Sequence, residues 1–217
     1  MTPTLIDHQD RVDCIREAVT LIAVRDGIGA VSLASVAEEL HLSTATLRRY
    51  VRSPEVLPQL GLEWVEHRRR RRRFRVMTTS RAAGTTSWAH AVRCLEAEMP
   101  VDDGRAEEAR AWHAVARGAA TAPALELTES HRELVGSCVR HLVGLGTVTT
   151  PDQRPATEVS LRSTVGGLVL GVVEGWATPA EVHAELTRQL DRLAPPAATG
   201  VTVGRDLLAV APAVNDR

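Results

Sequence analysis

The chain contains no lysine, so its 26 basic residues are all arginine, and 27 acidic residues bring the net charge to −1. A chain so close to neutrality can attract nucleic acid only where its arginines are locally concentrated. Aromatic residues are also scarce, with four Trp, one Tyr and one Phe. This number argues against a ligand cage for a quaternary ammonium group, which needs several aromatic rings.

Cysteine is scarce, and long apolar runs are absent. Cys14, Cys94 and Cys138 are odd in number and far apart, which argues against a disulfide framework and suits a reducing compartment. No apolar signal segment is present at the N-terminus. The longest apolar run, 165–173, is far shorter than the roughly 20 residues needed to cross a bilayer. We expect a cytoplasmic protein with no membrane partner.

Several motifs of enzymes are missing as well. The sequence has no P-loop, dinucleotide glycine motif, HExxH or GxSxG. His90 with Cys94, and Cys138 with His141, have spacings that could supply two pairs of zinc ligands, but no CxxC-type motif accompanies them. We expect no enzyme activity, no metal and no cofactor. An enzyme with an unrecognised or zinc-dependent site stays open as an alternative, as does a helical scaffold.

One stretch of the chain is strongly basic. Residues 43–76 hold ten arginines and three acidic residues, whereas residues 1–42 hold three arginines and seven acidic residues. Most of the excess comes from the run HRRRRRRFR at 67–75. The run could be a nucleic-acid grip or a solvated helix surface.

Apolar periodicity in the N-terminal part is typical of short helices. Gly27 is placed to end the first helix, and Ser32 and Ser43 are candidate N-caps for a second and a third. Ser53 and Pro54 provide a cap and a first-turn proline for a fourth. The apolar faces of the first three helices are Val12, Ile15, Val19 and Ile22; Leu33, Val36, Ala37 and Leu40; and Leu47 and Val51.

Three short helices with a three-residue break between the second and third are what a helix-turn-helix requires. The third helix would then expose two arginines able to bond guanine, threonines with a hydroxyl and a methyl, and a tyrosine that can reach a phosphate. The alternative is an ordinary solvated helix. The exposed set would be Thr44, Ala45, Thr46, Arg48, Arg49 and Tyr50.

The stretch AVSLASVAEELHLSTATLRRYVRSPEVL, residues 30–57, resembles the N-terminal DNA-binding domain of TetR-family transcriptional regulators. It departs from the family at Arg48, usually tyrosine, and at Pro54, usually a phosphate-contacting lysine that Arg52 would replace. The matching residues are Ser32, Ala37, Ser43, Thr46, Leu47, Tyr50, Ser53, Glu55 and Leu57. The resemblance implies DNA contacts from Ser32, Ser43, Thr44, Ala45, Thr46, Arg48, Arg49, Tyr50 and Arg52.

The C-terminal half resembles the BetI-type domain of one branch of that family. The similar segments are 98–119 and LRSTVGGLVLGVVEGW. The resemblance implies a helical bundle that binds a small-molecule effector and forms a homodimer, although the scarcity of aromatics argues against choline-like ligands. Candidate pocket residues, each of which could equally be core, are Trp88, Cys94, Trp112, His113, Cys138 and Trp176.

A helix predicted over 157–177 carries a bulky stripe beside a stripe of small residues. Interior glycines cost a helix about 1 kcal/mol each, so the small stripe indicates a close helix crossing. We expect the partner subunit there, although a crossing within one chain would explain it too. The predicted dimer interface is Thr164, Gly167, Gly171, Val182 and Leu186, the last two from a helix opened by Thr178, Pro179 and Glu181.

The arginine run is predicted to be mainly structural. An inward stripe through Leu57, Leu60, Trp64, His67 and Phe74 would include Arg71, because successive residues of a helix turn by 100°. A buried arginine needs a partner. The first helix offers Asp10, Asp13 and Glu17.

The sequence therefore predicts an all-α protein with two domains. Residues 8–67 would form the helix-turn-helix domain, 68–194 the helical ligand-binding and dimerisation bundle, and 195–217 a tail. The expected function is that of a TetR-type regulator, a repressor that binds a palindromic double-stranded DNA operator as a homodimer and is released by a small-molecule effector.

Overall fold

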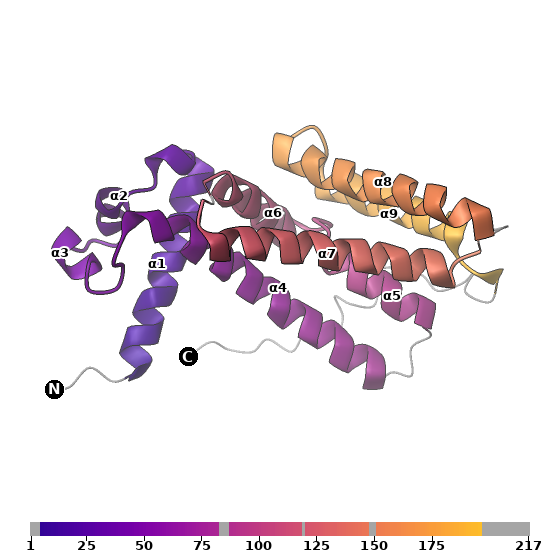
Figure 1. Cartoon of the computed structure of the whole chain (residues 1–217), viewed down its shortest axis with the longest axis horizontal. Helices are drawn as coiled ribbons and strands as arrows, with labels where there is room; N and C mark the ends of the chain where they lie inside the picture. Colours follow the sequence, from indigo (N-terminus) through magenta and orange to yellow (C-terminus); the bar gives the residue numbers. More distant parts are fainter. Residues whose placement is uncertain (1–4, 83–86, 119, 148–150, 197–217) are drawn as a thin grey trace.

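The computed structural model describes residues 5–82, 87–118, 120–147 and 151–196, and their regular structure is all helical (Figure 1). Short 3₁₀ turns at Ile28–Ala30 (η1), Pro54–Val56 (η2) and Pro151–Gln153 (η3) join some of the helices. The helices are α1 (Leu5–Arg25), α2 (Leu33–Glu39), α3 (Thr44–Leu47), α4 (Leu57–Ala82), α5 (Ser87–Glu96), α6 (Asp103–Ala116), α7 (Ala122–Leu145), α8 (Arg154–Glu174) and α9 (Pro179–Leu193).

Helices α1, α2 and α3 pack with the start of α4 around a small apolar core. Ile15, Val19 and Ile22 of α1 are buried there, as predicted, together with Val36 of α2 and Leu47 of α3. The predicted caps are confirmed: Ser32 and Ser43 each accept a hydrogen bond from the backbone N–H three residues on. These hydrogen bonds fix where α2 and α3 begin.

The two halves of the molecule share α4. Its first turns bury Leu62 and Val65 against Ala23 of α1 and Val115 of α6. At Gly61 the backbones approach so closely that a Cβ would lie 3.0 Å from a Val19 methyl. Because α4 continues unbroken to Ala82, the domain boundary predicted between residues 67 and 68 falls inside a helix.

Helices α5, α7, α8 and α9 enclose the C-terminal core. Trp88, Leu95, Leu142 and Val165 are among its buried side chains. Figure 1 shows α8 and α9 side by side at the flank away from α3. The predicted capping box at Thr178 and Glu181 is present at the start of α9. Of the predicted tail, 197–217 lies outside the described residues.

The predicted dimer interface on α8 and α9 includes residues that the chain itself buries. Val182 and Leu186 are 0% and 1% exposed in the core of their own chain, so their side chains cannot meet a partner. Gly171 is also buried, because the ring of Trp176 and Ala177 pack against it. Thr164 and Gly167 are half-buried, and a Cβ at Gly167 would meet nothing within 4 Å.

Helix α8 has an apolar surface that the described residues leave uncovered. Val159 and Leu170 are 64% and 47% exposed. Among the described helices, α8 is the one whose length and apolar composition would allow it to cross a membrane, and 22% of that stretch is buried.

The buried arginine of the run is Arg69, so the prediction for Arg71 was wrong. Arg69 is 4% exposed, whereas Arg71 is exposed and Phe74 is 67% exposed. The guanidinium carbon of Arg69 lies 4.5 Å from the centroid of the Trp112 ring, a cation–π contact. Burial lowers the pKa of Arg69 to about 10, although the nearby carboxylates of Glu98, Glu108 and Glu66 act to raise it.

The carboxylates that neutralise the run come from α4, α6 and the α5–α6 connection, not from the predicted Asp10, Asp13 and Glu17. Glu108 accepts from Arg72 at 2.8 Å, and Glu98 accepts from Arg73 at 3.2 Å. Glu66 also pairs with Arg73. The pairs with Glu108 and Glu98 link α4 to the C-terminal bundle, whereas the pair with Glu66 lies within α4. Asp13 pairs with Arg16, a residue of its own helix.

Candidate nucleic-acid interface

The third helix lies at one end of the molecule, where α2 and α3 project from the rest (Figure 1). Leu47 is fully buried and anchors α3 to the small core. Ser43 accepts a hydrogen bond from the Thr46 N–H at 3.1 Å and fixes the other end. With one end capped and one side chain buried, the remaining side chains have a defined outward direction.

The outward face of α3 consists of the predicted side chains. Thr44, Ala45 and Arg48 are exposed, and so is Arg49 in the turn that follows. Thr46 is half-buried, and its hydroxyl lies 2.8 Å from the Ser43 hydroxyl. A face with two guanidinium groups, a hydroxyl and a methyl has the chemistry needed to read base edges in a major groove.

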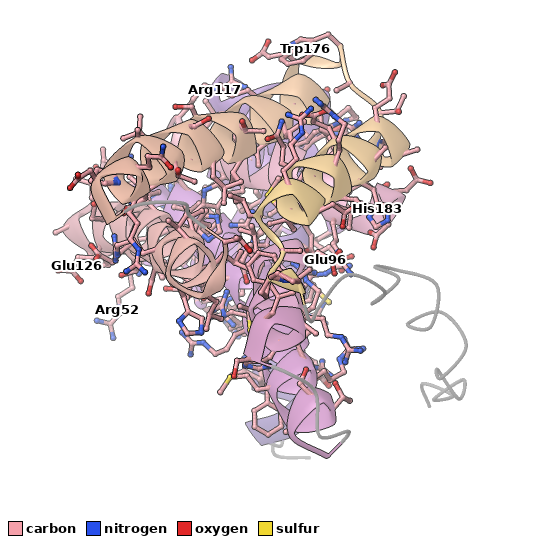
Figure 2. All side chains as sticks on the ribbon, turned by 90° about the vertical axis from the view of Figure 1, so that its right-hand side faces the viewer. Arg52, Glu96, Arg117, Glu126, Trp176 and His183 are labelled. Atoms are coloured by element: carbon pink, nitrogen blue, oxygen red, sulfur yellow. The ribbon has the colours of Figure 1, made fainter. Side chains whose placement is uncertain are left out.

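Tyr50, Arg52 and Ser32 flank this face in different ways. Tyr50 is half-buried and packs against the small core. Arg52 is exposed, and Figure 2 shows it pointing away from the body of the molecule. The Ser32 hydroxyl is exposed but already caps α2 through Ser35. Arg52 is therefore placed for a phosphate contact, whereas the Ser32 hydroxyl also serves as the N-cap of α2.

The three-residue break between α2 and α3 was predicted from the sequence, but the left-handed conformation of its turn was not. His41 adopts a left-handed backbone with φ 52°, at a position where glycine is usual. Its N–H bonds the Glu38 carbonyl at 3.0 Å, and the Leu42 N–H bonds the Ala37 carbonyl at 2.8 Å. This pair of hydrogen bonds is a Schellman motif, and it sets the angle between the two helices.

The arginines of this surface are free to bind an external anion. Over the described ranges of the chain, no carboxylate lies within salt-bridge distance of Arg48, Arg49 or Arg52. The nearest acidic residues in sequence are occupied, since Glu39 pairs with Arg25 and Glu55 accepts from the Ser53 hydroxyl. This surface differs in that respect from the buried part of the arginine run.

In the described part of the chain, the candidate pocket residues are divided between two apolar cores and the surface. Trp88 and Trp112 lie in two different apolar cores, and Trp176 is 67% exposed at the surface (Figure 2). Cys94 and Cys138 are half-buried, and burial raises the pKa of both thiols. His113 is also half-buried, and burial together with Arg69 and Arg117 lowers its pKa.

One of the two predicted pairs of zinc ligands is in contact. The Sγ of Cys94 lies 3.6 Å from Nε2 of His90. Within the residues that the structure places, no three His, Cys, Asp or Glu side chains come together as a metal site would require.

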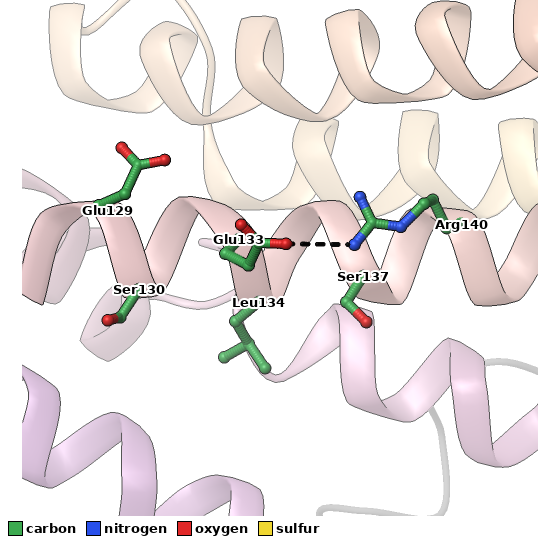
Figure 3. Close-up of a pocket in the computed structure, with 6 residues that line it drawn as sticks. All are labelled: Glu129, Ser130, Glu133, Leu134, Ser137 and Arg140. Carbon is green, nitrogen blue, oxygen red and sulfur yellow. Dashed lines mark hydrogen bonds and ion pairs between the residues drawn. The ribbon is translucent and has the colours of Figure 1, made fainter.

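Two clefts lie on the described part of the molecule, and neither is lined by a candidate pocket residue. One, of about 500 Å³, lies along the outer face of α7 (Figure 3). Its lining residues all come from that one helix. Among them, Nη2 of Arg140 lies 3.5 Å from Oε1 of Glu133. It is a surface hollow with no second wall. The other cleft, of about 270 Å³, lies between α1, α6 and α8.

Solved structures with the same fold include two from Rhodococcus. One is the crystal structure of a transcriptional regulator from Rhodococcus sp. Rha1, with a TM-score of 0.65, 18% identity and coverage of 84% of this chain and 95% of that one. Another is described as a TetR-family transcriptional regulator from Rhodococcus sp., with a TM-score of 0.63, 19% identity and coverage of 85% and 98%.

At these identities the likeness establishes the fold. The chain is all-α, with the N-terminal helix-turn-helix domain and the C-terminal helical domain that TetR-family regulators have. No family model matches the sequence. No match was found among curated proteins either.

Proposed function

We propose that the protein is a TetR-type transcriptional regulator that binds double-stranded DNA through α3. The observation that carries the proposal is the outward face of α3, where Thr44, Ala45, Arg48 and Arg49 are exposed and neither arginine forms an ion pair with a described residue. The Ser43 cap and the buried Leu47 hold this face in place. Preorganised, unpaired donors on a projecting helix are suited to entering a major groove.

Selection of bound DNA from a random pool tests this proposal. We expect a palindromic consensus, because a two-fold dimer reads two half-sites about 34–36 Å apart on one face of the duplex. If Arg48 or Arg49 bonds a guanine, its replacement by alanine will cost about 1–3 kcal/mol on the consensus and much less on random DNA. Equal losses on both would make that arginine a phosphate contact, and selection of no sequence would refute the proposal.

The arginine run makes at most a minor contribution to DNA binding in this proposal. Arg69, Arg72 and Arg73 are committed to the protein interior and its carboxylates, and the exposed Arg68 pairs with Glu108. The exposed remainder can be tested with the triple variant R70Q/R71Q/R75Q. We expect an unchanged consensus and a salt slope reduced by no more than about one unit, because each neutralised phosphate contributes about 0.9. A reduction near three units would assign the run to the DNA backbone.

We further propose that a second copy covers the exposed apolar surface of α8. Val159 and Leu170 support this, and the half-buried Thr164 and Gly167 would let a second helix approach closely. Leu170→Glu should give monomers in sedimentation velocity without detergent. Leu125→Glu, at a leucine on α7 that is 53% exposed, is the matched control and should leave the dimer intact. A dimer that survives Leu170→Glu would place the interface elsewhere.

Repression in the cytoplasm, with release by a small-molecule effector, completes the proposal, together with a BetI-type C-terminal domain. An effector that changes the distance between the two α3 helices only modestly prevents them from docking on both half-sites at the same time. The scaffold and enzyme alternatives predict that the random-pool selection enriches nothing.

A further inference from the structure

A cleft lies between the DNA-binding end of the molecule and the C-terminal bundle. Its apolar wall includes Val24 of α1, Ile28 of η1 and Val173 of α8. Its other wall is α6, through Arg110, Ala114 and Arg117. With a volume of about 270 Å³, it is a little smaller than the usual range for drug-sized ligands, about 300–1,000 Å³.

The wall formed by α6 is a consequence of helical spacing. Arg110, Ala114 and Arg117 stand at i, i+4 and i+7, so all three side chains lie on one face. The two arginine Cα atoms are about 10 Å apart along the helix, at 1.5 Å per residue. The small side chain of Ala114 leaves a hollow between the two longer ones.

Neither arginine of the cleft forms an ion pair with a described residue. Arg110 and Arg117 have no carboxylate within salt-bridge distance among the residues whose positions are described. Arg117 donates from Nε to the His113 carbonyl at 3.3 Å, which leaves its terminal N–H groups available. Two unpaired guanidinium groups beside an apolar wall match a molecule that has a carboxylate and a compact apolar body.

We propose that this cleft binds a small organic carboxylate, with the anion held by Arg110 and Arg117 and the apolar body against Val24, Ile28 and Val173. Its regulatory meaning rests on the proposed function. Ile28 also packs on the end of α6, where a Cβ at Gly118 would overlap its side chain. A ligand between α1 and α6 therefore acts at the contact that joins the DNA-binding end to the bundle, and its occupancy changes the affinity for DNA.

Calorimetric titration and thermal unfolding of the full chain with benzoate and hexanoate test the site. We expect both carboxylates to bind and to raise Tm, and the uncharged amide benzamide to do neither. Inorganic phosphate should bind more weakly than benzoate, because it has no apolar body. Absence of binding by both carboxylates, or equal binding of benzamide, overturns the proposal.

Two sets of variants, each with a matched control, locate the binding. R110Q and R117Q should each weaken benzoate binding about tenfold or more, since each removes a charge-assisted hydrogen bond. R154Q removes an exposed arginine at the start of α8 and should change nothing. Val24→Glu places a carboxylate opposite the arginines and should abolish binding, whereas Leu21→Glu, at an exposed residue of the same helix outside the cleft, should not. Benzoate that binds R110Q and Val24→Glu as tightly as wild type is bound elsewhere, and the assignment fails.

DNA binding separates this proposal from the previous one. If a consensus has been selected, saturating benzoate should change its affinity at least about fivefold in wild type and not in R110Q. A protein that binds benzoate but selects no DNA keeps the site and loses the proposed function. A protein that selects an operator but binds neither carboxylate keeps the function and loses the site. Binding without any change in DNA affinity overturns the regulatory part.

Discussion

Replacement of Arg73 by methionine tests whether the arginine run is structural. Met is of comparable length but uncharged, so Arg73→Met leaves Glu98 and Glu66 without their direct partner. The Glu98 side chain is 0% exposed, and removing one member of a buried ion pair typically costs about 3–5 kcal/mol. Arg73 is 21% exposed and Arg69 still attracts Glu98, so we expect a loss of about 2–4 kcal/mol. In a chain of this size the loss lowers Tm by about 5–15 °C.

Urea unfolding followed by circular dichroism measures the loss, and the same helix supplies the control. Arg70 is exposed and forms no ion pair among the described residues, so Arg70→Met should stay within about 0.5 kcal/mol of wild type. Adding Glu98→Gln to Arg73→Met should recover part of the loss, because it removes the unpaired carboxylate. If Arg73→Met is as stable as Arg70→Met, the reasoning that places the run in the interior is wrong.

Three further variants test other parts of the structure. Burial, with Arg69 and Arg73 adding to it, lowers the folded-state pKa of His131 to about 3, below its unfolded value near 6.5. The unfolded chain therefore takes the proton first, and stability present above about pH 6.5 is lost as the pH falls toward 3. Between about pH 4 and 6 this loss amounts to about 1.4 kcal/mol of unfolding free energy per pH unit, and His131→Gln should abolish it in urea titrations. The control His67→Gln, at an exposed histidine, should leave this pH dependence unchanged. Ser43→Ala should cost about 0.5–2 kcal/mol through the lost cap, and an unchanged urea midpoint would contradict the cap. Gly171→Leu should destabilise the monomer fold by about 1–3 kcal/mol because its Cβ meets the Trp176 ring, and dissociation of a dimer with unchanged stability would contradict this contact.

The helix starts could be read from the sequence because capping is local. The hydrogen bond from the Thr46 N–H to Ser43, and the reciprocal pair at Thr178 and Glu181, join residues only three positions apart. The apolar face of α1 was equally legible, since Ile15, Val19 and Ile22 repeat at helical spacing. The caps and the apolar periodicity each lie within one turn or one helix. The helix-turn-helix could therefore be recognised without tertiary information.

The orientation of the arginine run was not legible. Six consecutive arginines give no contrast between faces, so the inward residue depends on what lies beside α4. That neighbour is the α5–α6 region, where Glu98 and Glu108 lie far away in sequence. The extrapolated stripe pointed to Arg71, whereas packing against Trp112 selected Arg69.

Apolar stripes of the C-terminal helices posed the same problem in another form. Val182 and Leu186 repeat at helical spacing, which is equally suited to a core and to a subunit interface. Only the packing of α9 against its own chain decides that they are core, and the exposed Val159 and Leu170 mark the outer face of α8. The sequence by itself determined where helices begin and which side chains share a face, because those are short-range relations. The tertiary structure decided which face is inside and which arginines remain free for an anion, because both depend on residues that the fold brings together from distant parts of the chain.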